Sequence, residues 1–327
     1  MIEPVTTSQF VISLDFELMW GVRDHHTKDS YGANVLGVRQ AIPRILDEFE
    51  KRKIHATWAA VGLLFCEDKD EMMVVSPAVR PGYKDARLSN YEYFGEVGKN
   101  ELSDPYYFGL DLLKRVQACP GQEIGTHTFS HFYCLEPGAT AEAFRADLQA
   151  AIMIAKKRGF AMESIVFPRN QYDATYISIC KELGLRQYRG NEAGWIYRPT
   201  RGSGQNAVRR SLRLADAYVN ISGQNLAVTA RGDSGMRNIP SSRFLRPFAR
   251  KLEKLESLRL HRIRTAMTAA AQTGSHFHLW WHPHNFGRNL EENMGVLKQI
   301  LDHYQLLNEH AGMTSVAMRE VHAAASH

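Results

Sequence analysis

The chain has 327 residues, enough for one large domain or two ordinary ones, and 44% of them are hydrophobic, which can supply a sizeable core. The formal charge is only +5, and charges of both signs are mixed along the chain, so a nucleic-acid-binding protein is excluded. Four cysteines lie far apart with no CxxC pair, which excludes a zinc ribbon and a disulfide framework.

Neither a targeting segment nor a membrane span is predicted. The first nine residues, MIEPVTTSQ, have no basic start and no apolar signal run. The longest apolar stretch, residues 56–66, is too short to cross a bilayer. We therefore expect a soluble, cytoplasmic protein.

Strands and helices alternate in the apolar pattern from one end of the chain to the other. Strands are predicted at 10–14, 54–61, 122–126, 165–167, 185–188, 226–229, 237–239, 276–281 and 313–316, and helices at 35–53, just before Cys119, and at 139–158, 173–183, 242–271 and 290–307. The alternation favours an α/β fold, a distorted or incomplete (β/α) barrel with seven or eight parallel strands. We expect one domain over 1–327, with functional rim insertions at about 66–110 and 191–225.

The first predicted strand ends in two acidic residues. In FVISLDFELMWG, residues 10–21, a buried apolar run leads into Asp15 and Glu17. Side chains two apart on a strand share a face, so these carboxylates point the same way, roughly 7 Å apart. Acidic strand ends also occur as simple helix caps, so this motif alone leaves the choice open.

Two histidines follow the strand at 122–126. His127 and His131 in HTFSH are four residues apart, a spacing that places both imidazoles on one side of a helical turn. With a carboxylate from another strand, they would make an open three-ligand site for Zn²⁺ or a similar ion. A rival cluster would combine His276 and His278 with the histidines at 282 and 284, but no carboxylate lies near it in sequence.

Further polar residues follow other predicted strands. Arg169 follows the strand at 165–167, and His282 follows the strand at 276–281. The carboxyl ends of barrel strands converge on one site, so these residues are expected to meet Asp15, Glu17 and the HTFSH motif there.

This set of motifs resembles the polysaccharide deacetylase family with the NodB-homology domain, over residues 10 to about 316. SLDFE stands where the family has a TFDDG-like motif, and HTFSH where it has H(S/T)xxH. FPRNQY matches an Arg-bearing motif and LWWHPH the late Leu and His motif. Phe16 replaces the acid that commonly follows the first one, as in D-x-D and D-x-E branches of the family.

The resemblance implies a role for each matched residue. Asp15 is the general base, Arg169 orients it, and His282 is the general acid. His127 and His131 bind a divalent metal, with Zn²⁺ as the expected ion. Glu17 is the implied third ligand, with Asp15 as the alternative carboxylate.

Other residues are candidates for contacts outside this set. We expect Trp20, Trp195, His284 and Asn285 to bind substrate, the indoles by stacking on a sugar ring. The segment 243–264 holds eight Lys or Arg residues at helical spacing. It is interpreted as a barrel helix with a solvated basic face, and the alternative is peripheral contact with an anionic membrane or polyprenyl-phosphate substrate.

The expected activity is metal-dependent removal of an N-acetyl group from an N-acetylated sugar. The absence of an export signal favours a lipid- or nucleotide-linked precursor of a surface polysaccharide, such as an O-antigen. Alternatives with the same site are sugar deformylation and hydrolysis of a cyclic amide. A non-catalytic carbohydrate-binding barrel is the alternative from another class.

Overall fold

The fold is built around one curled, mainly parallel sheet, which the computed structural model describes over residues 8–197, 207–226, 230–231 and 235–321. Its strands are β1 (Gln9–Phe16), β2 (Ala56–Ala60), β3 (Gln122–Thr126), β4 (Ser164–Ile165), β5 (Gln187–Gly190), β6 (Ala230–Arg231), β7 (Arg237–Pro240), β8 (Arg243–Phe244), β9 (His276–Trp281) and β10 (Thr314–Val316). Within the described part of the chain, every pairing is parallel apart from β6 with β7.

Two short strands separated by two residues bring the ends of the sheet together. The strand order is β6-β7-β5-β4-β3-β2-β1-β9-β8, with β10 also on β1. β7 pairs with β5, and β8 pairs with β9 at the opposite end of the order. Because Ser241 and Ser242 alone separate β7 from β8, residues 237–244 connect the two ends, and the sheet is the predicted distorted (β/α) barrel.

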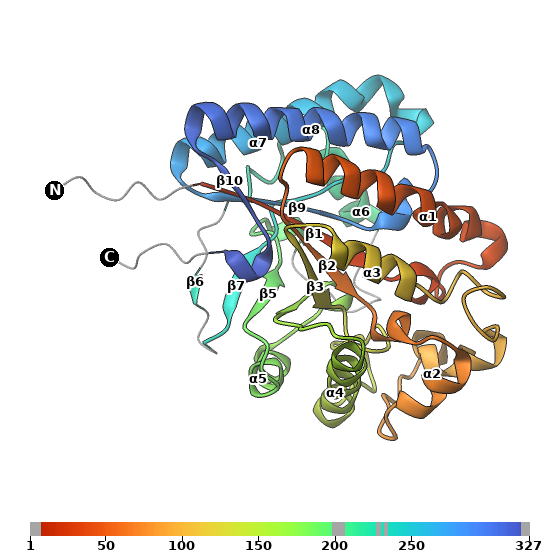
Figure 1. Cartoon of the computed structure of the whole chain (residues 1–327). Helices are drawn as coiled ribbons and strands as arrows, with labels where there is room; N and C mark the ends of the chain where they lie inside the picture. Colours follow the sequence, from red (N-terminus) through yellow and green to blue (C-terminus); the bar gives the residue numbers. More distant parts are fainter. Residues whose placement is uncertain (1–7, 198–206, 227–229, 232–234, 322–327) are drawn as a thin grey trace.

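Helices cover the outside of the sheet (Figure 1). They are α1 (Lys28–Lys51), α2 (Lys69–Val75), α3 (Leu110–Ala118), α4 (Ala141–Lys157), α5 (Ala174–Glu182), α6 (Ala207–Asp216), α7 (Glu256–Thr273) and α8 (Leu290–Ala311). α7 packs on α8, and α4 packs on α5. No described helix is both long and apolar enough to cross a membrane.

The alternation of side chains along β1 separates two environments. Phe10, Ile12 and Leu14 face outward into the main core beneath the helices. The opposite face of the strand lines the barrel interior, where Val11 packs in a small apolar cluster with residues of other strands and of the C-terminal segment: Ala59, Val166, Ile239, Met318 and Val321. Asp15 lies on this inner face, at the carboxyl end of the strand, where a barrel places its site.

Two predicted elements are changed by the structure. Strands 122–126 and 276–281 have the predicted bounds, but the helix predicted at 242–271 begins only at Glu256. Pro247 opposes a helix there, and residues 243–244 pair with β9 instead. The strand predicted at 226–229 lies mostly outside the described residues. The insertion at 191–225, expected to be irregular, contains α6.

The basic segment 243–264 does not present one solvated basic face. Arg243, Arg259 and Arg262 are buried, each bonded to a carboxylate or to backbone carbonyls. The cations that remain exposed are in and next to the 3-10 turn Arg250–Leu255. The prediction of a solvated helix face is therefore wrong for three of its arginines, because they are neutralised inside the fold.

Candidate active site

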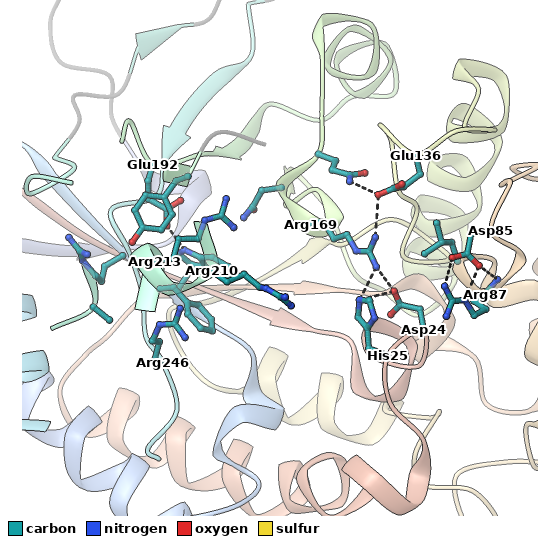
Figure 2. A pocket seen from close by; sticks show the side chains of 18 residues that line it. Asp24, His25, Asp85, Arg87, Glu136, Arg169, Glu192, Arg210, Arg213 and Arg246 are labelled. Carbon is teal, nitrogen blue, oxygen red and sulfur yellow. Dashed lines mark hydrogen bonds and ion pairs between the residues drawn. The ribbon is translucent and has the colours of Figure 1, made fainter. Parts of the chain in front are cut away.

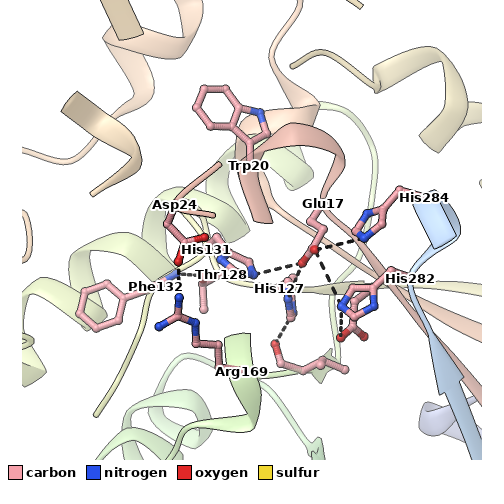
Figure 3. A network of polar contacts seen from close by, with 12 residues as sticks. Glu17, Trp20, Asp24, His127, Thr128, His131, Phe132, Arg169, His282 and His284 are labelled. Atoms are coloured by element: carbon pink, nitrogen blue, oxygen red, sulfur yellow. Dashed lines mark hydrogen bonds and ion pairs between the residues drawn. The ribbon is translucent and has the colours of Figure 1, made fainter. Parts of the chain in front are cut away.

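A buried carboxylate lies against two buried histidines at the carboxyl end of the sheet (Figure 3). Glu17, which follows β1, has Oε2 at 3.4 Å from His127 Nε2 and at 3.1 Å from His131 Nε2. One ligand atom from each of these residues lies within 4.8 Å of the others. Among the described residues, this is the group of His, Cys, Asp and Glu side chains that could hold a metal ion.

The hydrogen bonding of His127 indicates that the group fits a cation. Its Nδ1 lies 2.8 Å from the carbonyl oxygen of Val166, which can only accept, so Nδ1 carries the proton. In the neutral ring, Nε2 then turns a lone pair toward Glu17, as metal-binding histidines do. Burial raises the pKa of Glu17, but charge at His282 and contacts with both histidines lower it well below its ordinary value. An ionised carboxylate beside two imidazole Nε2 atoms suits a divalent ion, which would take the place of a proton on these nitrogens.

The loop that carries both histidines is held by a buried aspartate. Thr128 and His131 have φ of 63° and 60°, so HTFSH is an irregular loop and not the predicted helical turn. Asp147 on α4 accepts hydrogen bonds from the backbone N–H groups of Phe129, at 2.6 Å, and Ser130. These bonds offset the cost of a strained loop that brings the ring centroids of the two histidines within 4.9 Å.

Asp15 is paired with an arginine from β5. Arg189 Nη1 donates to Oδ1 at 2.6 Å, and Nη2 donates to Oδ2 at 2.8 Å. Burial raises the pKa of Asp15, but Arg189 together with His127 and His282 outweighs it, and the pKa lies below its ordinary value. Asp15 is therefore held ionised in one orientation, facing His282, whose Nε2 is 3.7 Å from Oδ2.

The predicted partner of Asp15, Arg169, lies elsewhere. It forms an ion pair with Asp24 and bonds Glu136 at 3.2 Å, while its guanidinium stacks over the ring of Tyr133 at 4.1 Å. The expectation that Arg169 orients Asp15 is wrong. The 3-10 turn Pro168–Asn170, with Arg169 at φ of 53°, turns its side chain toward the rim, whereas Arg189 lies on a strand that faces the interior.

Two further histidines approach Glu17 from the loop after β9 (Figure 3). His282 Nε2 lies 3.8 Å and His284 Nε2 lies 3.9 Å from Glu17 Oε1, and the two rings stack. Burial lowers the pKa of His284 to about 3, so its imidazole is neutral. His284 thus lies beside the carboxylate of Glu17, and its contact with substrate stays a prediction.

Comparison with known proteins decides the family. The family model described as "Polysaccharide deacetylase" matches residues 7–188, more than half of the chain. The chain belongs to the polysaccharide deacetylase family. Membership supports a carbohydrate deacetylase, in agreement with the resemblance in the motifs. No curated protein matches the chain.

Solved structures share the fold of this deacetylase at low sequence identity. A protein from Mycobacterium smegmatis, assigned as a polysaccharide deacetylase, is 13% identical with a TM-score of 0.57, covering 96% of this chain and 89% of that one. One from Pseudomonas aeruginosa PAO1 with the same assignment is 11% identical with a TM-score of 0.56, at 96% and 89% coverage. An allantoinase is 11% identical with a TM-score of 0.54, also at 96% and 89%. At these identities the likeness concerns the fold alone.

The rival histidine cluster does not form in the deacetylase. His278 is buried inside the barrel, where Nε2 bonds Ser13 Oγ at 2.9 Å and Nδ1 bonds the carbonyl of Ile239 at 3.3 Å. His276 Nε2 lies 3.2 Å from the carbonyl of Pro240. Both histidines of β9 are therefore used in the barrel wall, and burial lowers the pKa of each.

The predicted substrate contacts of the two tryptophans have different outcomes. Trp20 is only 1% exposed, packs on Tyr107 and donates Nε1 to its carbonyl at 2.8 Å, so that prediction is wrong and Trp20 is a core residue. Trp195 is 56% exposed in the insertion after β5, and its substrate contact stays a prediction. The same holds for Asn285, which is buried with Nδ2 lacking a partner among the described residues.

An open cavity of about 640 Å³ lies beside the site. Some residues of the cavity and of the site were not predicted from the sequence. Trp280 and Phe244 line it, and both rings lie close to His282, with centroids at 5.7 and 5.8 Å. The guanidinium of Arg189 stacks on Trp280 at 4.2 Å. The sequence held one indication of the role of Arg189. It directly follows the predicted strand at 185–188, and a charge buried at a strand end requires a partner.

Proposed function

We propose that this polysaccharide deacetylase is a metal-dependent N-deacetylase that hydrolyses the amide of an N-acetylated sugar. The observation that carries the proposal is the juxtaposition of two groups. Asp15, fixed by Arg189 and 3.7 Å from His282, adjoins the buried Glu17, His127 and His131 group. A base, an acid and three metal ligands thus converge at the carboxyl ends of the strands.

Glu17, His127 and His131 would hold the ion, with Zn²⁺ as the expected species. When bound, a divalent ion polarises an amide carbonyl and lowers the pKa of a nearby water. Asp15 takes the proton from the attacking water, because its carboxylate is ionised and cannot rotate away from Arg189. His282 then donates a proton from Nε2 to the departing amine nitrogen. Each proton transfer contributes on the order of 10²- to 10⁴-fold in rate.

The separate roles of the two carboxylates provide the test. Asp15→Asn is expected to retain metal and lose turnover of an N-acetylated sugar by at least about 100-fold. Glu17→Gln is expected to lose metal, measured by plasma emission spectrometry on the folded protein. The reverse pattern would exchange the two roles. A metal-free wild type that binds N-acetylglucosamine without hydrolysing it would instead support a non-catalytic barrel.

The same assay separates the related activities. An N-formylated sugar and a cyclic amide such as allantoin would be offered beside the N-acetylated sugar. A higher kcat/KM for either would replace deacetylation by deformylation or ring opening without changing the roles of Asp15 and His282. A role in making a precursor of a surface polysaccharide, such as an O-antigen, stays a prediction, as does membrane contact through 243–264.

A further inference from the structure

The cavity beside the site is lined by six arginines, three of which pair with carboxylates. Each of three arginines pairs with a carboxylate: Arg87 with Asp85, Arg169 with Asp24, and Arg243 with Asp216. Arg210, Arg213 and Arg246 form no ion pair with any described residue. Figure 2 shows these three grouped on one side of the cavity, which we call the arginine end.

The arginine end is a concentration of positive charge in which Arg213 and Arg246 are half-buried and Arg210 is exposed. Arg210 and Arg213 are three apart on α6 and share a helix face, while Arg246 follows β8. Burial lowers the pKa of Arg246, and the positive charges of Arg213 and Arg259 lower it further. Burial also lowers the pKa of Arg213. Cations gathered this way repel one another, and an anion from solution would relieve the repulsion.

One carboxylate of the cavity lining, Glu192, partly offsets this charge, because it raises the pKa of Arg213. It is buried, and its Oε1 accepts a hydrogen bond from Trp280 Nε1 at 3.0 Å. Arg213 donates Nε to the carbonyl of Ile196 at 2.7 Å, which fixes the side chain and leaves both Nη groups without a hydrogen-bond acceptor among the described residues. The guanidinium is therefore oriented for a ligand.

The helix that carries two of these arginines is anchored. Asp216, the last residue of α6, is fully buried and pairs with Arg243 at 2.7 Å and Arg262 at 3.3 Å. Tyr197 donates to the same carboxylate at 2.7 Å. α6 is thereby fastened to β8 and α7, so Arg213 has a rigid base.

The arginine end lies on the same cavity as the aromatic wall beside His282. Trp280 and Phe244, with ring centroids 4.6 Å apart, line the cavity and border His282. A sugar ring on this wall would present its acyl amide to Asp15 and His282, and a charged substituent to the arginines.

We propose that the arginine end binds a phosphoryl group, so that the substrate is an N-acylated sugar carrying a phosphate or diphosphate. This inference rests on the proposed deacetylase function. Three guanidinium groups offer more donors than one carboxylate can accept, whereas a diphosphate accepts from all of them. A uronic acid would use one bidentate arginine and leave the others without a counter-charge.

Binding of inorganic pyrophosphate tests the site without any turnover. Calorimetry on the wild type at low salt should detect binding, and Arg213→Ala with Arg246→Ala should weaken it by at least about tenfold, since each change removes charge-assisted hydrogen bonds to phosphate oxygens. Arg250→Ala, an exposed cation outside the cavity lining, is the matched control. Equal binding in all variants, or none in the wild type, would overturn the proposal.

Turnover then identifies the carrier. We would compare kcat/KM for UDP-N-acetylglucosamine, a polyprenyl-diphosphate-linked N-acetylglucosamine in detergent, an N-acetylated uronic acid and free N-acetylglucosamine. A phosphorylated sugar should be preferred over the free sugar by at least tenfold, and the ratio should fall in the double variant. Preference for the uronic acid would refute a phosphoryl site.

The outcomes separate the two proposals. Pyrophosphate binding without deacetylation of any sugar would refute the function and leave the anion site standing. Deacetylation of neutral sugars without pyrophosphate binding would support the function and refute the anion site. If the alanine variants fail to fold, Arg213→Lys and Arg246→Lys keep the charge but lose the planar fork, and should weaken binding less than alanine would. Binding that is as strong in these variants as in the wild type would refute recognition by the guanidinium fork.

Discussion

Arg189 and Asp15 form a two-pronged ion pair across the barrel interior, with donor–acceptor distances of 2.6 and 2.8 Å. Both side chains are almost fully buried, and Arg189 is covered on one side by Trp280. The pair fixes the direction of the proposed base before any substrate arrives. The orientation of Asp15 therefore depends on Arg189 of β5. Asn170, next to Arg169 in the turn, contributes through Arg189, because its Oδ1 accepts a hydrogen bond from Arg189 Nη2 at 3.0 Å.

We expect Arg189→Lys to lower kcat by about 10- to 100-fold, because one ammonium group cannot occupy both oxygens of Asp15. The variant keeps the charge and should fold. Arg189→Ala leaves a buried carboxylate unpaired and should cost about 3–5 kcal/mol of stability. Arg169→Lys is the comparison in steady-state kinetics. If it lowered kcat as much as Arg189→Lys does, the proposal that Arg189 in particular orients Asp15 would be wrong.

Gly21 leaves the space that Glu17 occupies. A Cβ at residue 21 would lie 2.0 Å from the Glu17 carboxyl carbon. Gly21→Ala should therefore displace the carboxylate from the two histidines and reduce the metal content of a folded protein. In Gly295→Ala, a Cβ meets nothing within 4 Å, and this helical variant should keep its metal and gain about 0.5–1 kcal/mol. Full metal content in Gly21→Ala would contradict the assignment of Glu17 as a ligand.

Metal should stabilise the folded chain. Zn²⁺ added to chelator-treated protein at 100 times its dissociation constant should raise the free energy of unfolding by about 2.7 kcal/mol. The shift in Tm measures this gain by differential scanning fluorimetry. His131→Ala should lose most of the shift, while His282→Ala should keep it. An equal shift in His131→Ala would place the ion elsewhere.

Asp147 should make stability depend on pH. Burial raises its pKa to about 6 from an ordinary value of 3.8, so between these values the folded state holds more protons than the unfolded state. The stability contributed by Asp147 therefore falls as pH rises through this window, by up to about 1.4 kcal/mol per pH unit. Urea unfolding with a chelator present should show this loss in the wild type and not in Asp147→Asn. Parallel pH curves would refute the shift.

The buried charges around α6 should matter more than exposed ones. Asp216→Asn leaves Arg243 and Arg262 without their counter-charge and should destabilise the protein by about 3–5 kcal/mol. Asp302→Asn breaks the ion pair of Asp302 with Arg52. Because the Asp302 side chain is 56% exposed, this change should cost less than about 1 kcal/mol. Similar losses in urea unfolding would show that Asp216 does not anchor the helix.

The sequence predicted the features that local pattern determines. The apolar alternation of β1 and β9, and the convergence of strand ends, led to the barrel and to the grouping of Glu17, His127 and His131. These predictions succeeded because strand ends in a barrel share one face of the molecule.

The errors arose where long-range pairing decides the structure. Arg169 matches a motif, but a left-handed backbone at that residue turns it to the rim. Arg189 reaches Asp15 because β5 and β1 face each other across a closed barrel, a relation that no local pattern encodes. Likewise, Trp20 is buried by Tyr107 from the 66–110 insertion. Residues 243–244 join the sheet edge because β9 offers a pairing partner.

The pairing of β5 with β7 has a consequence for how such enzymes diversify. Residues 191–236 connect β5 to β7 and contribute the edge strand β6. Because β5 and β7 pair with each other, the two attachment points of this segment are set by sheet register. The segment can thus be lengthened, shortened or exchanged without moving Arg189. Arg189 is the first residue after the part of the chain that matches the family model, which ends at 188. Changes within residues 191–236 can therefore alter which substrates the enzyme accepts, while the pair of Asp15 and Arg189 stays unchanged.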